Sequence, residues 1–82
     1  MPDVVLNLEI ARRYTNGEAR LKVEGDTIRA LINALDTEFP GIGAVLRTDM
    51  AVAIDSLIYQ DADLEPVKPD SEVCFIPAIE GG

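Results

Sequence analysis

The stretch TIRALINALDTEFPG, residues 27–41, has the pattern of one amphipathic helix, and the rest of the fold can be placed around it. Its apolar residues recur every three or four positions along one helical face: Ile28, Leu31, Ile32, Leu35 and Phe39. Thr27 is the expected N-cap, because its hydroxyl can accept a hydrogen bond from an unpaired backbone N–H. Pro40 and Gly41 are expected to end the helix.

Two alternating segments come before this helix. Residues 4–10 place an apolar side chain at every second position, and residues 19–23 do the same, which is typical of strands with one buried face. Between them lies Asn16-Gly17, the strongest short signal for a hairpin turn. The first third of the chain is therefore predicted to be a β-hairpin.

The region after the helix is predicted to return to strands. Short apolar runs between polar turns predict strands at residues 51–54, 57–59 and 72–76. Residues 55–56 form the predicted turn between the first two strands. Residues 42–47 are ambiguous and fit either a loop or one short helical turn. Leu64 and Val67 are expected to anchor the polar connection over residues 61–70.

The predicted order β-β-α-β-β-β places one main helix across one mixed sheet of about four to five strands. This is an α+β architecture, the β-grasp or ubiquitin-like fold. Residues 1–77 are expected to form the domain and residues 78–82 a flexible C-terminal tail. Pro77 marks the boundary, because proline lacks a backbone donor and discourages a sheet from continuing. Such a fold does not by itself indicate a function.

Charge and composition disfavour several classes of function. The chain has 82 residues and a formal net charge of −8, so neither nucleic acid nor an anionic membrane is an expected partner. A basic protein partner would be steered toward this surface, although solubility alone also explains the charge. The N-terminus lacks the pattern of a signal peptide, so a cytoplasmic protein is expected.

Catalytic and metal-binding residues are scarce. The chain has no histidine and a single cysteine, Cys74, which cannot alone form an internal disulfide, a zinc site or an iron–sulfur cluster. Cys74 is expected to pack within its strand. No nucleophile–base pair or metal-ligand spacing stands out among the carboxylates, so an independent enzyme is the least expected function, and neither a metal nor a bound cofactor is expected.

The strongest functional signal is the ending FIPAIEGG, residues 75–82. A terminal carboxylate is unreactive until it is activated, for example as an acyl-adenylate. Glycine has no Cβ, so Gly81 and Gly82 would let an activating enzyme approach the carboxylate closely. Ile79 could be gripped by the channel just before them. The alternative is that the two glycines are incidental.

This ending resembles that of the ThiS/MoaD family of β-grasp sulfur carriers. DSEV at residues 70–73 resembles the family's Gly-Asp-Glu-Val stretch, with Ser71 as a departure. GDTI at 25–28 and FPGI at 39–42 resemble the family's helix, and look most similar to the cysteine-pathway carrier there. Residues 53–56 lie where many members have a valine–asparagine–glycine turn, but contain no glycine.

The resemblance implies a function shared with partner enzymes. An E1-like adenylyltransferase would use ATP to adenylate Gly82, and a persulfide sulfur would then replace AMP to give a C-terminal thiocarboxylate. The sulfur-accepting enzyme would be the large subunit of molybdopterin synthase, a cysteine synthase or a thiazole synthase. The tail residues read by these partners would be Pro77, Ala78, Ile79, Glu80 and Gly81.

Two alternatives stay open at the level of sequence. The same tail would serve a protein modifier that is joined to target lysines through Gly82. The last strand, residues 73–76, is apolar on both faces, which fits either a strand covered on both sides or an exposed docking surface. The candidate docking residues are Phe75, Ile76 and Ile58.

Overall fold

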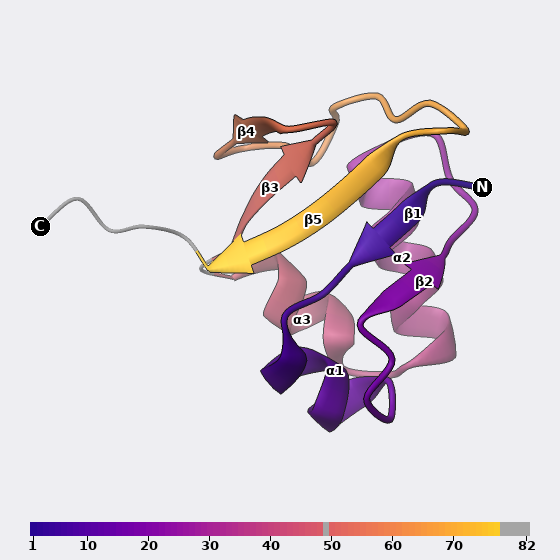
Figure 1. The fold of residues 1–82 in the computed structure, drawn as a ribbon, viewed down its shortest axis with the longest axis vertical. Coiled ribbons are helices and arrows are strands. Elements are labelled where there is room, and N and C mark those ends of the chain that lie inside the picture. Colours follow the sequence, from indigo (N-terminus) through magenta and orange to yellow (C-terminus); the bar gives the residue numbers. More distant parts are fainter. Residues whose placement is uncertain (49, 78–82) are drawn as a thin grey trace, which may run out of the picture.

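The computed structural model describes residues 1–48 and 50–77, which form a five-stranded mixed sheet with α2 and α3 packed on one face (Figure 1). The elements are β1 (Asp3–Val5), α1 (Leu8–Tyr14), β2 (Arg20–Lys22), α2 (Ile28–Glu38), α3 (Ile42–Arg47), β3 (Met50–Ile54), β4 (Leu57–Tyr59) and β5 (Glu72–Pro77). The strands lie in the order β2-β1-β5-β3-β4, and only the β1–β5 pair among these described strands is parallel. The predicted β-grasp architecture is therefore confirmed.

The main helix, α2, begins and ends where the sequence predicts. Thr27 Oγ1 accepts a hydrogen bond from the backbone N–H of Ala30 at 3.1 Å, as an N-cap should. The helix ends at Glu38, and Gly41 then adopts a φ of +99°, which favours glycine. The predicted apolar stripe is buried at Ile28, Leu31, Ile32 and Leu35, and half-buried at Phe39. The ambiguous segment after Gly41 is helical and forms α3.

The core lies between the helical layer and one face of the sheet. Val4 of β1 and both Val73 and Phe75 of β5 are at most 1% exposed. They belong to the same buried cluster as Leu31 and Leu35 of α2. The two adjacent central strands, β1 and β5, are thus fixed by buried apolar side chains.

The first predicted strand is wrong beyond residue 5. β1 ends at Val5, and Asn7 then caps α1 by accepting a hydrogen bond from the Ile10 N–H at 2.8 Å. Ile10 and Ala11 are both buried, and two consecutive buried residues fit a helix facing a core better than a half-exposed strand. β1 and β2 pair in antiparallel fashion as predicted, but α1 lies between them in the chain, so the predicted hairpin turn at residues 16–17 does not join the two strands. Asn16 and Gly17, both with positive φ, reverse the chain after α1.

The expected anchor at Leu64 is also wrong. Leu64 is 70% exposed, whereas Val67 is buried as predicted. The connection is held near Leu64 by its backbone, because the carbonyl oxygen of Asp63 accepts a hydrogen bond from the N–H of Arg29 at 2.8 Å. The Asp63 carboxylate also pairs with the Arg29 guanidinium at 2.6 Å. With the backbone and Asp63 bound to α2, the connection is held without burying Leu64.

Pro77 is the last residue of β5, one residue beyond the predicted end of this strand, and it lies opposite Met50 of β3. Hydrogen-bonded pairs alternate along an antiparallel ladder. Because the Asp55 N–H donates to the Glu72 carbonyl at 2.9 Å, the Met50–Pro77 pair falls at a position where no backbone bonds are exchanged. On the other side, pairing with β1 has already ended at Val5. The missing N–H of proline therefore breaks no ladder bond.

Candidate functional site: the open face of the sheet and the end of β5

The site predicted from the sequence starts where β5 ends. Pro77 is the last residue of β5, and it is exposed. The predictions for Ala78, Ile79, Glu80, Gly81 and Gly82 lie outside the described residues. The structure describes the surface of the sheet up to Pro77, the residue that precedes these five in the chain.

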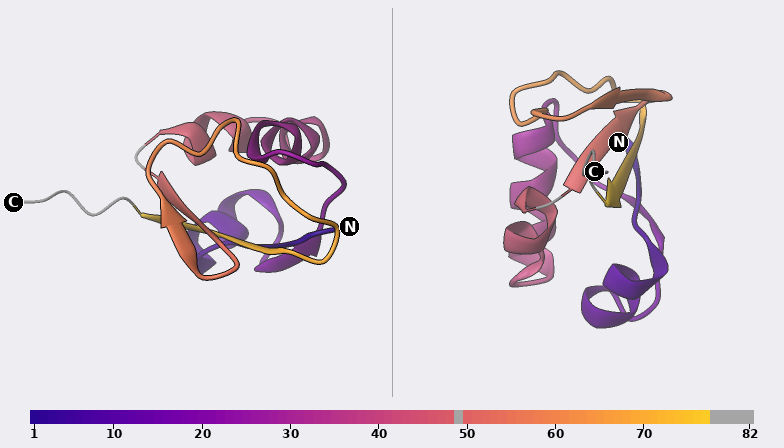
Figure 2. Two further views of the ribbon diagram at one scale, coloured as in Figure 1. Left: turned by 90° about the horizontal axis from the view of Figure 1, so that it is seen from above. Right: turned by 90° about the vertical axis from the view of Figure 1, so that its left-hand side faces the viewer.

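The side chains of β5 divide between the two faces of the sheet. Val73 and Phe75 are buried toward the helices, whereas Cys74 and Ile76 lie on the opposite face and are only half-buried. Viewed from above, α2 and α3 lie on one side of the sheet, and none of the described elements covers the other (Figure 2). We call this second side the open face.

Phe75 was therefore wrongly assigned to the docking surface, because it fills the core and is 1% exposed. Ile58 and Ile76 do lie on the open face. The register places Val5, Cys74, Ala53 and Ile58 in one row across β1, β5, β3 and β4. Ile58 is 63% exposed at the end of this row.

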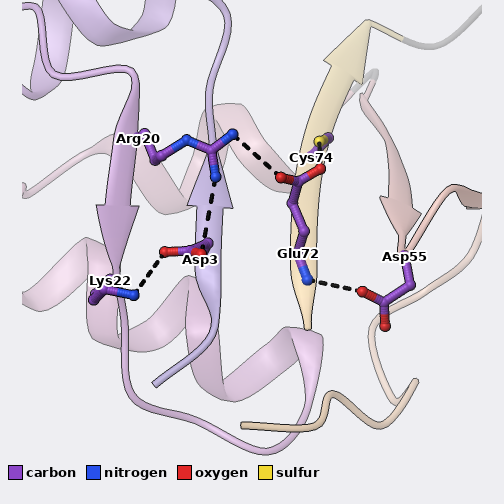
Figure 3. A network of polar contacts seen from close by, with 6 residues as sticks. All are labelled: Asp3, Arg20, Lys22, Asp55, Glu72 and Cys74. Atoms are coloured by element: carbon purple, nitrogen blue, oxygen red, sulfur yellow. Dashed lines mark hydrogen bonds and ion pairs between the residues drawn. The ribbon is translucent and has the colours of Figure 1, made fainter. Parts of the chain in front are cut away.

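The other half of the open face, toward the start of β5, is charged (Figure 3). Asp3 lies between Lys22 Nζ, at 3.1 Å, and Arg20 Nη1, at 3.9 Å. Arg20 Nη2 also reaches Glu72 Oε2 at 3.2 Å. These pairs are well exposed, so each contributes little to stability. The open face thus has an apolar half beside the end of β5 and a charged half farther from it.

Cys74 lies between these two halves. Its Sγ is 3.8 Å from Glu72 Oε1. Partial burial raises the pKa of the Cys74 thiol above its ordinary value, and the nearby Glu72 carboxylate contributes a smaller increase. A raised pKa keeps the thiol protonated, which makes it a poor nucleophile. This environment suits the packing role expected for Cys74.

The start of β5 is held by Ser71, which is 2% exposed. Its hydroxyl donates to Asp55 Oδ2 at 2.9 Å and accepts from the Lys68 N–H at 3.1 Å. Asp55 Oδ1 accepts a second bond, from the Glu72 N–H at 2.9 Å (Figure 3). The hydrogen bond from the Glu72 N–H lowers the pKa of the Asp55 carboxyl most, and the bond from the Ser71 hydroxyl lowers it further. Asp55 therefore ties the β3–β4 turn to the beginning of β5.

This lowered pKa predicts an acid-dependent loss of stability. The ionised Asp55 is favoured in the folded state, so its contribution is present above the ordinary carboxyl pKa of 3.8 and is lost as pH falls through the lower folded value. We expect Asp55→Asn to be less stable than the wild type at pH 7, and the difference to shrink in strong acid. Urea unfolding across this pH range measures it.

The matched control is Asp70→Asn, at an exposed carboxylate for which the described structure shows no hydrogen bond. It should not reproduce the pH-dependent difference. A penalty for Asp55→Asn that stays constant from neutral pH to strong acid would show that the carboxylate charge does not matter.

Within residues 1–48 and 50–77, no three Cys, Asp or Glu side chains are grouped so that they could hold a metal ion. Among the helices of the same residues, none is long and apolar enough to cross a membrane.

A scan against protein-family models matches the ThiS family over residues 4–82. The chain belongs to the ThiS family. The match covers nearly the whole sequence and confirms the resemblance to this family that the sequences of the tail and the helix indicated. A search of curated proteins found no match.

Solved structures share the fold. A chain of the Amycolatopsis orientalis BexX/CysO complex is 22% identical, with a TM-score of 0.84 over 100% of both chains. CysO from Mycobacterium tuberculosis is 17% identical, with a TM-score of 0.85 over 96% of this chain and 100% of the other. Small archaeal modifier protein 1 from Methanosarcina acetivorans is 14% identical, with a TM-score of 0.78 over 99% and 95%. At these low identities the structural similarity shows the fold alone, and it agrees with the β-grasp fold that the sequence predicted.

Two departures from the ThiS-family pattern meet in this structure. In the resemblance noted from the sequence, Ser71 stands in place of an aspartate, and residues 53–56 stand in place of a turn that contains glycine. A carboxylate at position 71 would repel the Asp55 carboxylate, whereas the serine hydroxyl donates a hydrogen bond to it. Serine at position 71 is therefore compatible with aspartate at position 55.

The missing glycine leaves strain in the turn. Asp55 and Ser56 have φ values of 48° and 75°, and this turn conformation favours glycine. Ser56→Gly is expected to stabilise the fold by about 0.5–1 kcal/mol, because the left-handed conformation is unfavourable for a residue with a Cβ. Thermal or urea unfolding measures the change. Ser56→Ala is the control, since it keeps the Cβ; equal stability of the two variants would contradict the explanation.

Proposed function

We propose that this ThiS-family chain is a sulfur carrier whose Gly82 carboxylate is adenylated and then converted to a thiocarboxylate. The observation that carries the proposal is the Gly81-Gly82 ending, five residues beyond the last paired residue of β5, Pro77. In this proposal the chain presents a reactive group, and partner enzymes perform the catalysis.

The proposed chemistry has two stages. A Gly82 carboxylate oxygen attacks the α-phosphorus of ATP bound by an E1-like adenylyltransferase, and pyrophosphate leaves. A persulfide sulfur of the sulfur-delivery system then attacks the acyl carbon, and AMP leaves. A second thiol cleaves the resulting acyl disulfide, is itself oxidised to a disulfide, and releases the thiocarboxylate. ATP is a substrate of the activating enzyme, and the carrier needs no cofactor of its own.

The tail residues have distinct roles in this scheme. Glycine at positions 81 and 82 leaves room for the nucleotide and the attacking sulfur around the reacting carbonyl. Ile79 and Glu80 would be read by the partner's channel, together with Pro77 and Ala78. The acceptor would be a cysteine synthase, a molybdopterin synthase large subunit or a thiazole synthase. We rank the cysteine-type acceptor first, because two of the similar structures contain CysO.

The apolar half of the open face is the proposed docking surface. It contains the exposed Ile58 and the half-buried Ile76, and it adjoins the end of β5, the strand that precedes the tail in the chain. A partner that takes the tail must approach this end of the sheet. The net charge of −8 would also steer a partner with a basic surface toward the chain.

Ile58→Asp is expected to weaken the reaction with the activating enzyme. A charge introduced into an apolar contact should raise the KM for the carrier by about tenfold, or about 1.4 kcal/mol. Steady-state kinetics with varied carrier concentration measures the change. Leu57→Asp is the matched control, because Leu57 is equally exposed, at 64%, but points to the opposite face of β4. Equal effects of the two substitutions would contradict docking on the open face.

Carrier-dependent exchange of pyrophosphate into ATP tests the adenylation stage directly. With an E1-like enzyme, the full chain should support exchange, whereas no exchange with any such enzyme would refute the proposal. The protein-modifier alternative has a different product. A diglycine remnant on lysines of other proteins after protease digestion, without transfer of sulfur, would support that alternative instead.

A further inference from the structure

The two edges of the sheet differ in how well they are protected against pairing with another strand. At one edge, Arg20 and Lys22 of β2 are exposed, and both pair with Asp3 of the neighbouring strand. Charged side chains of this kind discourage the addition of a further strand. At the other edge, β4 carries Leu57 and Ile58, which are 64% and 63% exposed. The β4 edge is therefore the less protected of the two.

The backbone of Ile58 faces this free edge. The Asp55 N–H donates to the Glu72 carbonyl, and hydrogen-bonded pairs recur at every second residue of an antiparallel ladder. Ala53 is therefore hydrogen-bonded to Cys74 of β5 and turns its backbone groups away from β4. Its partner on β4, Ile58, belongs to a pair without backbone bonds, so the Ile58 N–H and carbonyl point away from β3.

The charges that flank β4 indicate what kind of strand fits this edge. Asp55 precedes β4 and Asp61 follows it, and both are exposed. If a second copy of the chain paired antiparallel about Ile58, residue 55 of one copy would lie opposite residue 61 of the other. Like charges directly opposite each other destabilise such a pair. A strand with an apolar centre and a basic residue at each end would instead place opposite charges beside Asp55 and Asp61.

We propose that the β4 edge binds an extended segment of a basic partner protein by strand addition. The central residue of that segment would exchange two backbone hydrogen bonds with Ile58, and its side chain would lie on the open face. The two neighbouring residues would lie on the other face, beside Leu57 and Tyr59. The net charge of −8 favours the approach of such a partner. This contact is made through the backbone and does not depend on the proposed sulfur chemistry.

A seven-residue peptide, added to the full chain, tests the inference. The probe is Lys-Thr-Val-Val-Val-Thr-Lys, blocked at both ends, so that its middle valine can lie opposite Ile58 and its lysines opposite Asp55 and Asp61. Two further versions each carry one N-methyl group, either on the middle valine or on the valine before it. Only the first of these loses a bond to Ile58, because the N–H of the neighbouring valine points away from β4.

We expect the unmodified peptide to bind with a Kd of about 1 mM. At about three times this concentration it should slow hydrogen exchange at the Ile58 amide by about fourfold. The version methylated on the middle valine should bind at least about tenfold more weakly, and the other version within about threefold of the unmodified peptide. NMR titration measures all three affinities.

Two chain variants with the same change of charge separate a local effect from a global one. Asp61→Lys should weaken binding of the peptide by about tenfold, because it places like charges opposite each other. Glu18→Lys is the matched control, at an exposed residue just before the opposite edge strand, β2. It should change the affinity by less than about twofold, since solvent and salt screen distant charges.

Each outcome bears on one part of the inference. No binding of the peptide at several millimolar, or equal binding of the two N-methyl versions, would overturn strand addition at Ile58. Equal effects of Asp61→Lys and Glu18→Lys would overturn the preference for a basic segment. An Ile58 amide that is protected in the chain alone, at concentrations where the chain sediments as a dimer, would place a second copy at this edge and refute a basic partner.

Discussion

Removal of Gly81 and Gly82 is expected to abolish adenylation of the chain while leaving its fold intact. The truncated chain would end at Glu80, about 7 Å short of the normal C-terminus, so its carboxylate would not reach the nucleotide. The buried core side chains of the described chain all precede Pro77. The free energy of unfolding should therefore stay within about 0.5 kcal/mol of the wild-type value.

Carrier-dependent pyrophosphate exchange and urea unfolding measure the two effects on the same preparation. Gly82→Ala is the matched variant, because it keeps the length of the tail and adds one Cβ next to the reacting carbonyl. We expect it to lower the rate by roughly a hundredfold. Wild-type activity in the truncated chain would show that the glycines are incidental.

Phe75→Ala is expected to have the largest effect on stability. Phe75 is 1% exposed and lies opposite Val52 in the centre of the sheet. Its truncation should cost about 3–5 kcal/mol through lost burial and the cavity left behind. A domain of this size has a total stability of about 5–15 kcal/mol, so much of it would be lost.

Ile76→Ala provides the comparison within the same strand. Ile76 is half-buried on the open face, so its truncation leaves no enclosed cavity and should cost less than about 1.5 kcal/mol. Urea unfolding of both variants measures the difference. Equal costs would mean that Phe75 does not face the core as the structure shows.

Elements with an unambiguous local sequence pattern were predicted correctly, and those with an ambiguous pattern were not. The helix at α2 could be predicted because its cap, stripe and terminating Pro40-Gly41 all agree. Residues 4–10 were misassigned because their apolar positions fit both the two-residue period of a strand and the period of a helix. Asn7, a good N-cap residue in the middle of the run, was the available signal for a helix beginning at Leu8.

The candidate site could be predicted only in part. The alternation in β5 indicates that Cys74 and Ile76 share a face, but it does not show which face meets the helices when both are apolar. That choice depends on the tertiary packing of Phe75. The role of Pro77 likewise depends on the register of β3 and β5, since proline is tolerated only where the ladder needs no donor.

The mass of the carrier after reaction tests the central claim most directly. The intact chain is incubated with ATP, an E1-like enzyme and a persulfide sulfur source, and its C-terminal peptide is then fragmented. A sulfur carrier should gain about 16 Da, the difference between oxygen and sulfur, and the gain should lie on Gly82. A chain that forms the adenylate but never gains this mass, with any persulfide donor, would contradict the account.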